Sequence, residues 1–164
     1  MSYSAAILTI STKGATGERE DSSGATIREI LESGGFAITR YEIVTDSQAE
    51  IAKRLRLWSD GAETVQLIVT TGGTGLSPRD VTPEAMRELL DYEVPGIAEA
   101  MRAEGLKHTP MSMISRALAG VRNKTLIINL PGSPKAVREN LAVVLPILPH
   151  ALDLLAGGGS DHPL

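Results

Sequence analysis

The chain has 164 residues and a net charge of −4, and 42% of its residues are hydrophobic. This length suits a single domain, and the acidic balance argues against general nucleic-acid binding. The sequence has no cysteine, which excludes disulfides and thiolate metal sites and fits a cytoplasmic location. Because no apolar run approaches the ~18 residues of a membrane span, we expect no membrane partner. We predict one domain over residues 1–156 and a flexible, glycine-rich tail over residues 157–164.

Four short apolar runs predict strands, with helical patterns between them. The strands are expected at Ala5–Ile10, Ile38–Val44, Gln66–Thr71 and Lys124–Leu130. Apolar residues spaced as on one helix face predict helices around residues 27–31, 51–58, 86–90, 96–106 and 134–148, the last interrupted at Pro146. Residues 108–121 fit either a short helix or an extra strand. The alternation predicts an α/β domain with a mostly parallel sheet flanked by helices.

The third strand runs directly into the glycine-rich segment Gly72-Gly73-Thr74-Gly75. Such a segment can turn backbone N–H groups toward an anion, most often a phosphate. The alternative is a tight turn, but a turn needs one glycine and this segment has three. The pattern matches neither the Walker loop nor the dinucleotide fingerprint. It therefore predicts phosphate chemistry without specifying a reaction.

Two aspartates follow strand ends and are candidates for Mg²⁺ binding or catalysis. Asp80 follows the glycine segment, where Thr82 and Pro83 already supply a helix cap and a first-turn proline. Asp46 ends the second strand, beside the capping residue Ser47. We expect Asp80 to be free for chemistry, and for Asp46 we favour a functional role only slightly over a role as the cap itself.

Other polar segments leave the same predicted rim, beyond the carboxyl ends of the strands, where ligands bind in parallel sheets. The segment 131–135 fits a helix start and equally an anion site. Arg116 could clamp a phosphate or cover the surface. Ser11 and the stretch 21–24 are locally more typical of a solvated loop.

Two blocks resemble the signatures of the molybdenum cofactor biosynthesis family, the molybdopterin adenylyltransferase and gephyrin N-terminal type. They are residues 70–84, which contain TTGGTG and RDVTPE, and residues 115–135, which end in LPGSPK. The resemblance extends over about residues 5–155. At one position the chain departs from the pattern: Thr12 stands where many members carry aspartate.

The resemblance implies a three-layer, Rossmann-like domain that forms homotrimers. It implies Mg²⁺-dependent adenylylation of molybdopterin by ATP, which gives adenylyl-molybdopterin and pyrophosphate, and hand-over of the product to a molybdenum insertase. The implied catalytic and metal-binding residues are Asp46 and Asp80. The implied nucleotide-binding residues are Thr71, Gly72, Gly73, Gly75, Leu130, Pro131, Gly132 and Ser133, and the implied molybdopterin-binding residues are Ser11, Thr74, Ser115, Arg116 and Lys135. The alternatives are a non-catalytic molybdopterin-binding paralogue that carries or hands on the pterin, and a nucleotide-cleaving hydrolase.

Overall fold

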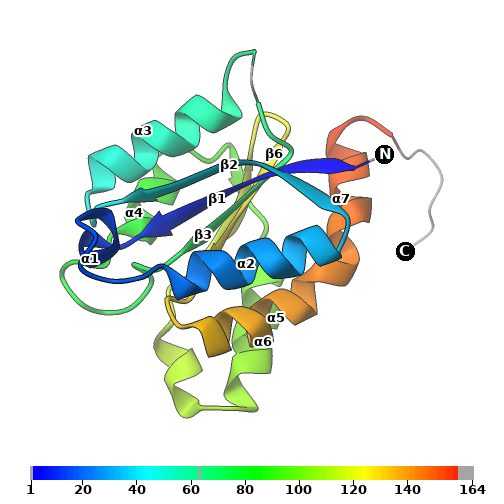
Figure 1. Cartoon of the computed structure of the whole chain (residues 1–164). Coiled ribbons are helices and arrows are strands. Elements are labelled where there is room, and N and C mark those ends of the chain that lie inside the picture. The colour runs from blue at the N-terminus through cyan, green and yellow to red at the C-terminus, as the bar shows by residue number, and fades with distance from the viewer. Residues whose placement is uncertain (1, 63, 159–164) are drawn as a thin grey trace.

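A mixed sheet forms the middle layer of the computed structural model, which describes residues 2–62 and 64–158 (Figure 1). Its strands are β1 (Tyr3–Ile10), β2 (Phe36–Val44), β3 (Leu67–Thr71), β4 (Tyr92–Glu93), β5 (Ala119–Arg122) and β6 (Thr125–Leu130). The order across the sheet is β2-β1-β3-β6-β5-β4. The neighbours from β2 to β6 pair in parallel, and β5 is antiparallel to both β6 and β4. The four predicted strands therefore form the parallel part of the sheet.

Helices cover both faces of this sheet. They are α1 (Thr12–Ala15), α2 (Ser22–Ser33), α3 (Gln48–Ser59), α4 (Thr82–Arg87), α5 (Pro95–Leu106), α6 (Pro134–Val144) and α7 (Leu148–Leu155), with 3-10 turns η1 (Pro110–Ile114) and η2 (Leu145–Ile147). The break between α6 and α7 falls at Pro146, as predicted from its missing N–H group. The ambiguous stretch 108–121 contains both a helical turn, η1, and most of an extra strand, β5.

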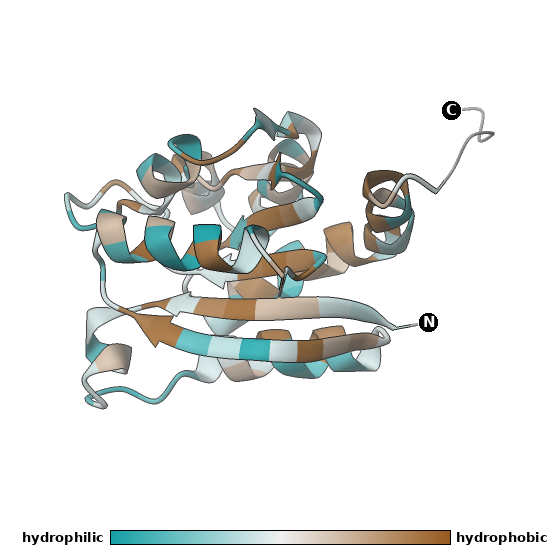
Figure 2. Cartoon of the chain, turned by 90° about the horizontal axis from the view of Figure 1, so that it is seen from above, coloured by the Kyte–Doolittle hydropathy of each residue, from teal (hydrophilic) through white to brown (hydrophobic). Residues whose placement is uncertain are grey.

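Alternate residues of the central strands pack into two separate cores. On β3, Leu67 and Val69 contact the core beneath α2, α5, α6 and α7, whereas Ile68 contacts the core beneath α3 and α4. The near-continuous apolar run of β3 follows from this, because successive side chains point to opposite faces and both faces are covered. Hydrophobic residues accordingly concentrate on the strands and on the helix faces turned toward them (Figure 2). The predicted three-layer α/β architecture is confirmed.

Two short elements, α1 and β4, were not predicted, and β5 was predicted only as one alternative for residues 108–121. The four-residue helix α1 follows β1 directly, and the Ser11 side chain caps it by accepting a hydrogen bond from the Gly14 N–H (3.0 Å). Of the predicted tail, Gly157 and Gly158 donate backbone hydrogen bonds to the last turn of α7, and residues 159–164 lie outside the described part. Within that part, every helix is too short or too polar to cross a bilayer.

Candidate functional site

The polar loops that follow the four parallel strands leave from one rim of the sheet (Figure 1). The register pairs the last residues of neighbouring strands: Ile10 with Val44, Thr9 with Thr71, and Thr71 with Leu130. The Gly72 N–H then donates to the Leu130 carbonyl (3.1 Å), and the Thr71 hydroxyl donates to the Pro131 carbonyl (2.6 Å). The glycine segment and the 131–135 segment are thus joined where they leave the sheet.

Two glycines of this rim, Gly72 and Gly73, are required by the backbone itself. Gly72 and Gly73 have φ values of +97° and +69°, which side chains rarely tolerate. A Cβ atom on Gly72 would also collide with the Ile10 carbonyl, and one on Gly73 with the Thr82 hydroxyl. The expectation that the turn needs only one glycine is therefore wrong. Thr82 is not the helix cap either: α4 has Val81 at its N-cap position, and the Thr82 hydroxyl donates to the Gly72 carbonyl (3.0 Å).

Beyond Gly73, however, the loop keeps donors that the protein does not use. The N–H groups of Gly73, Thr74 and Gly75 find no acceptor within residues 2–62 and 64–158. Backbone N–H groups seldom remain unpaired away from water or a ligand. The loop geometry therefore remains suited to an anion, although its glycines also have steric reasons.

Arg116 holds this loop from outside. Its guanidinium donates through Nε to the Gly75 carbonyl (2.9 Å), through Nη2 to the Asp80 carbonyl (2.7 Å) and through Nη1 to Glu84 (2.5 Å). The Arg116 hydrogen bond lowers the pKa of the Glu84 carboxyl below its ordinary value, against a smaller desolvation effect. All three guanidinium nitrogens are engaged. The structure thus gives Arg116, predicted to contact molybdopterin, the role of fixing the loop to α4.

The two candidate aspartates each have one oxygen committed to the backbone. Asp80 Oδ2 accepts a hydrogen bond from the Ser77 N–H (3.2 Å), and Asp46 Oδ2 accepts from Thr12. Their Oδ1 atoms have no hydrogen-bond partner in the described part of the chain. Nowhere in that part do three or more His, Asp or Glu residues form a metal-binding group. A cation held by both aspartates would find one unpaired oxygen on each and take other ligands from water and substrate, which suits Mg²⁺ because it keeps several waters and binds substrate phosphates.

A cavity of about 450 Å³ opens at the rim between β1, β3 and β6. We call it the rim pocket; residues 9–11, 14, 19–23, 71, 72 and 132–134 line it. It brings together five residues predicted for the site, namely Ser11, Thr71, Gly72, Gly132 and Ser133. Its other polar residues, Thr9, Arg19, Glu20, Asp21, Ser22 and Ser23, were not assigned to the site from the sequence.

The segment 21–24 forms one wall of the rim pocket, so its interpretation as a solvated loop is wrong. Asp21 caps α2 by accepting from the Gly24 N–H (2.9 Å), and its other oxygen accepts from the hydroxyls of Thr9 (2.7 Å) and Tyr41. Ser23 is buried and donates to the Gly132 carbonyl (2.5 Å). An aspartate three residues before glycine, just ahead of an apolar helical pattern, is the cap signal that could have predicted this.

Two helices start at the rim pocket. Ser22 and Ser23 open α2, and Ser133, the N-cap of α6, accepts from the Ala136 N–H (3.2 Å). The N–H groups of Ser22, Ser23, Gly132 and Ser133 have no acceptor in the described part of the chain. Together with the positive ends of both helix dipoles, these donors make the pocket suited to an anionic ligand.

A smaller cavity of about 240 Å³ lies on the other side of the 131–133 turn. It contains the predicted residues Ser115, Pro131 and Ser133, so Ser133 borders both cavities. Lys135 is exposed and its Nζ lies 4.0 Å from Glu139 Oε1. The remaining predicted residues line neither cavity: Asp46, Gly73, Thr74, Gly75, Asp80, Arg116, Leu130 and Lys135.

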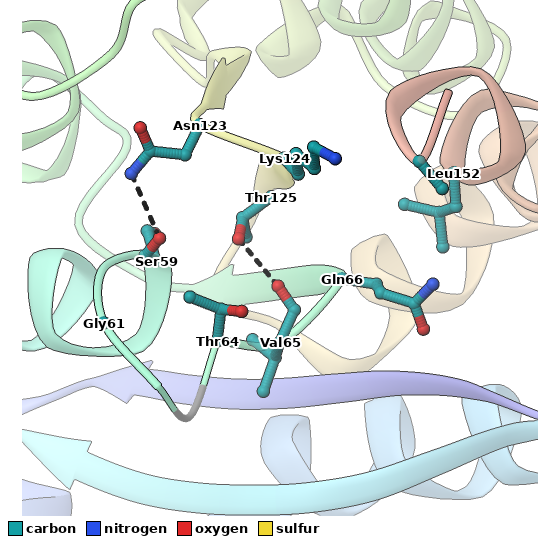
Figure 3. Close-up of a pocket in the computed structure, with 10 residues that line it drawn as sticks. Ser59, Gly61, Thr64, Val65, Gln66, Asn123, Lys124, Thr125 and Leu152 are labelled. Carbon is teal, nitrogen blue, oxygen red and sulfur yellow. Dashed lines mark hydrogen bonds between the residues drawn. The ribbon is translucent and has the colours of Figure 1, made fainter. Parts of the chain in front are cut away.

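The larger cavity of about 530 Å³ lies at the opposite end of the sheet (Figure 3). Two of its hydroxyls are already engaged: Thr125 donates to the Val65 carbonyl (2.6 Å), and Ser59 to the Leu55 carbonyl (2.7 Å). It contains none of the predicted site residues. We favour the rim pocket as the functional site, although it is smaller than this cavity, because ligands of parallel sheets bind beyond the carboxyl ends of the strands.

Comparison with known proteins agrees with the resemblance. A family model described as "Probable molybdopterin binding domain" matches residues 6–150. The molybdopterin adenylyltransferase of Helicobacter pylori (strain J99 / ATCC 700824) is 43% identical over 155 residues, which cover 92% of this chain and 86% of that protein.

A solved structure and a longer relative also match this chain. The molybdopterin biosynthesis enzyme MoaB from Thermus thermophilus is 57% identical, with a TM-score of 0.89 over 97% of this chain and 99% of that one. A molybdenum cofactor biosynthesis bifunctional protein of Synechococcus elongatus is 39% identical over 96% of this chain and 48% of that protein. By family match, sequence identity and fold, this chain belongs to the molybdenum cofactor biosynthesis family.

Proposed function

We propose that this protein transfers the adenylyl group of ATP to molybdopterin and releases pyrophosphate. The observation that carries the proposal is the rim pocket of about 450 Å³, lined by Ser22, Ser23, Gly132 and Ser133, whose N–H groups have no acceptor in the described part of the chain. Both substrates carry phosphate, and such donors bind phosphate without a net positive charge on the chain. A relative named molybdopterin adenylyltransferase, 43% identical over nearly the whole chain, supports this reaction over other phosphate chemistry.

In the proposed reaction a phosphate oxygen of molybdopterin forms a bond to the α-phosphorus of ATP. The bond from that phosphorus to the bridging oxygen of the β-phosphate breaks, and pyrophosphate leaves with the electron pair. The protein's contribution is to position both phosphates in line and to stabilise their charge. The donors would come from the rim pocket and from the N–H groups of Gly73, Thr74 and Gly75, which have no acceptor among the described residues, and Ser115 lines the adjoining cavity.

Mg²⁺ is part of the proposal, with Asp46 and Asp80 as the protein oxygens that would hold it. When bound, it would neutralise phosphate charge and stabilise the leaving pyrophosphate. Both aspartates leave one carboxylate oxygen unpaired in the described part of the chain. The donor set therefore fits a hydrated cation that takes most of its ligands from water and substrate.

Assembly and hand-over are also proposed. We expect a cytoplasmic homotrimer that passes adenylyl-molybdopterin to a molybdenum insertase. The Synechococcus bifunctional protein supports hand-over, because it carries a domain like this one within a chain about twice as long. Physical linkage of two steps raises the effective concentration of the intermediate at the second site.

The second candidate is a non-catalytic paralogue that carries molybdopterin. Thr12 favours it, because a hydroxyl stands where many members carry a carboxylate and engages Asp46. Incubation of the protein with ATP, Mg²⁺ and molybdopterin separates the two functions. We expect one pyrophosphate for each adenylyl-molybdopterin formed. Molybdopterin binding without pyrophosphate release would establish the carrier, and AMP release without the pterin would establish a hydrolase.

A further inference from the structure

Arg19 is the single lysine or arginine among the residues that line the rim pocket. Its side chain is exposed, and it makes no hydrogen bond or ion pair with any residue in the described ranges. Guanidinium groups beside a cavity are usually paired with a carboxylate or directed toward a ligand. Arg19 therefore has its full set of five donors available at the pocket.

The backbone at Arg19 is nevertheless fixed. Its N–H group donates to the Lys13 carbonyl (3.2 Å), as does the N–H of Glu18 (2.9 Å). Gly17, at φ +79°, makes the reversal that folds this segment back onto α1. A fixed backbone with an unpaired side chain places the charge at the pocket while leaving the guanidinium free to reorient toward a ligand.

No second basic side chain lines the rim pocket. All three guanidinium nitrogens of Arg116 bind atoms of the protein, and Lys135 lies outside the rim pocket beside Glu139. The pocket's own acids leave the balance negative, since Glu20 and Asp21 stand against the one positive charge of Arg19. Both Asp21 oxygens already accept hydrogen bonds. Arg19 is thus the charged group of the pocket lining that can neutralise an anion there.

We infer that Arg19 binds a substrate phosphate group in the rim pocket, donating to two of its oxygens at once. The inference rests on the proposed function for the identity of the ligand, because the phosphate belongs either to ATP or to molybdopterin. It assigns the anion contact to a residue outside both signature blocks, in place of Arg116 and Lys135.

The test is Arg19→Gln, which removes the charge and the guanidinium fork from an exposed side chain. Lys13→Gln is the matched control, because it removes one charge from the same segment outside the pocket. We expect Arg19→Gln to weaken either ATP–Mg²⁺ or molybdopterin at least about tenfold, as for loss of a charge-assisted hydrogen bond. Which ligand is weakened identifies the phosphate. Arg19→Lys should restore only part of the affinity.

Equal affinities of Arg19→Gln and wild type for both substrates would overturn the inference, and so would an equal loss in Lys13→Gln. Binding of inorganic pyrophosphate, followed by calorimetry, separates this failure from failure of the proposed function. If the wild type binds neither substrate, the proposed function falls. A tenfold weaker pyrophosphate affinity in Arg19→Gln would still support Arg19, and an unchanged or absent affinity would refute it. Unaltered melting of the variant confirms that folding is not the cause.

Discussion

Thr12 and Asp46 make three hydrogen bonds to each other across the ends of β1 and β2. The Thr12 hydroxyl (2.9 Å) and the Thr12 N–H (3.1 Å) both donate to Asp46 Oδ2, and the Asp46 N–H donates back to the Thr12 hydroxyl (3.2 Å). The hydroxyl is donor and acceptor at once, which a carboxylate could not be at neutral pH. Asp46 and the start of α1 therefore form one unit in this chain, and an aspartate at position 12 would meet Asp46 as a like charge.

The contribution of the Thr12 hydroxyl to stability can be measured with Thr12→Val, which removes the hydroxyl but keeps the shape and the N–H group. Two of the three hydrogen bonds are lost, and we expect the free energy of unfolding to fall by about 1 kcal/mol. Urea denaturation gives the value, with Thr12→Ser as the control that restores the hydroxyl. If Thr12→Val and Thr12→Ser unfold at the same urea concentration, the hydroxyl contributes nothing to this unit.

Asp80→Asn tests the carboxylate charge without removing the loop contact. The asparagine carbonyl can still accept from the Ser77 N–H, so melting should not change. Turnover should fall roughly a hundredfold or more, because a cation can no longer be held by a charged oxygen at this point. The pyrophosphate-release assay measures it.

A matched change elsewhere supplies the control for Asp80→Asn. Asp91 also accepts a backbone hydrogen bond, from the Asn123 N–H (2.7 Å), at the opposite end of the sheet. Asp91→Asn should leave turnover intact. Normal turnover in Asp80→Asn, or an equal loss in Asp91→Asn, would remove Asp80 from the proposed mechanism.

Gly73→Ala tests whether the fold itself requires glycine at this position. The new Cβ would meet the Thr82 hydroxyl in a backbone conformation of positive φ, so we expect a loss of about 2 kcal/mol in the free energy of unfolding. Gly96→Ala in α5 is the control, because its Cβ would enter open space at ordinary φ. That variant should be neutral or slightly more stable. Equal stability of the two variants would contradict the steric interpretation.

The fold could be predicted because its pattern is repeated over whole elements. The apolar runs of β3 and β6 report burial on both faces, and each predicted strand begins or ends within two residues of the observed one. The antiparallel strand β4 was not predicted and β5 was predicted only as one of two alternatives, because these strands are two and four residues long. Their pairing is set by tertiary contacts that no local periodicity records.

The site could be predicted only in part, for a related reason. The strand ends and glycines in the sequence predicted Gly72, Gly132 and Ser133 as site residues, and these three residues line the rim pocket. The engagement of Arg116 by Gly75, Asp80 and Glu84 depends on residues 32 to 41 positions away, so its local sequence could not reveal it. Arg19 stood in no recognisable motif, and only the folded position of the segment after α1 brings it to the pocket.

A pH-dependent contribution to stability is expected from Asp60 and Arg122, far from the rim. Arg122 donates through Nε to Asp60 Oδ1 (2.9 Å) and through Nη2 to Oδ2 (2.8 Å), and Asn123 also donates to Oδ1 (2.7 Å). The Arg122 hydrogen bond lowers the pKa of the Asp60 carboxyl below its ordinary value of 3.8. The unfolded chain therefore takes up this proton first as the pH falls, so the contribution is present above about pH 4 and is lost below it.

Asp60→Asn should thus lower Tm at pH 7 by about 2–4 °C, as expected for a partly exposed pair in a chain of this size. The difference from wild type should shrink as the pH falls below about 4, because the unfolded chain then takes up the proton before the folded chain does. Calorimetric melts between pH 3 and pH 7 measure it. Glu99→Gln, an exposed acid of α5 with no ion pair in the described part of the chain, should show no such convergence. A Tm difference for Asp60→Asn that stays constant over this range would show that the Asp60 charge does not stabilise the fold.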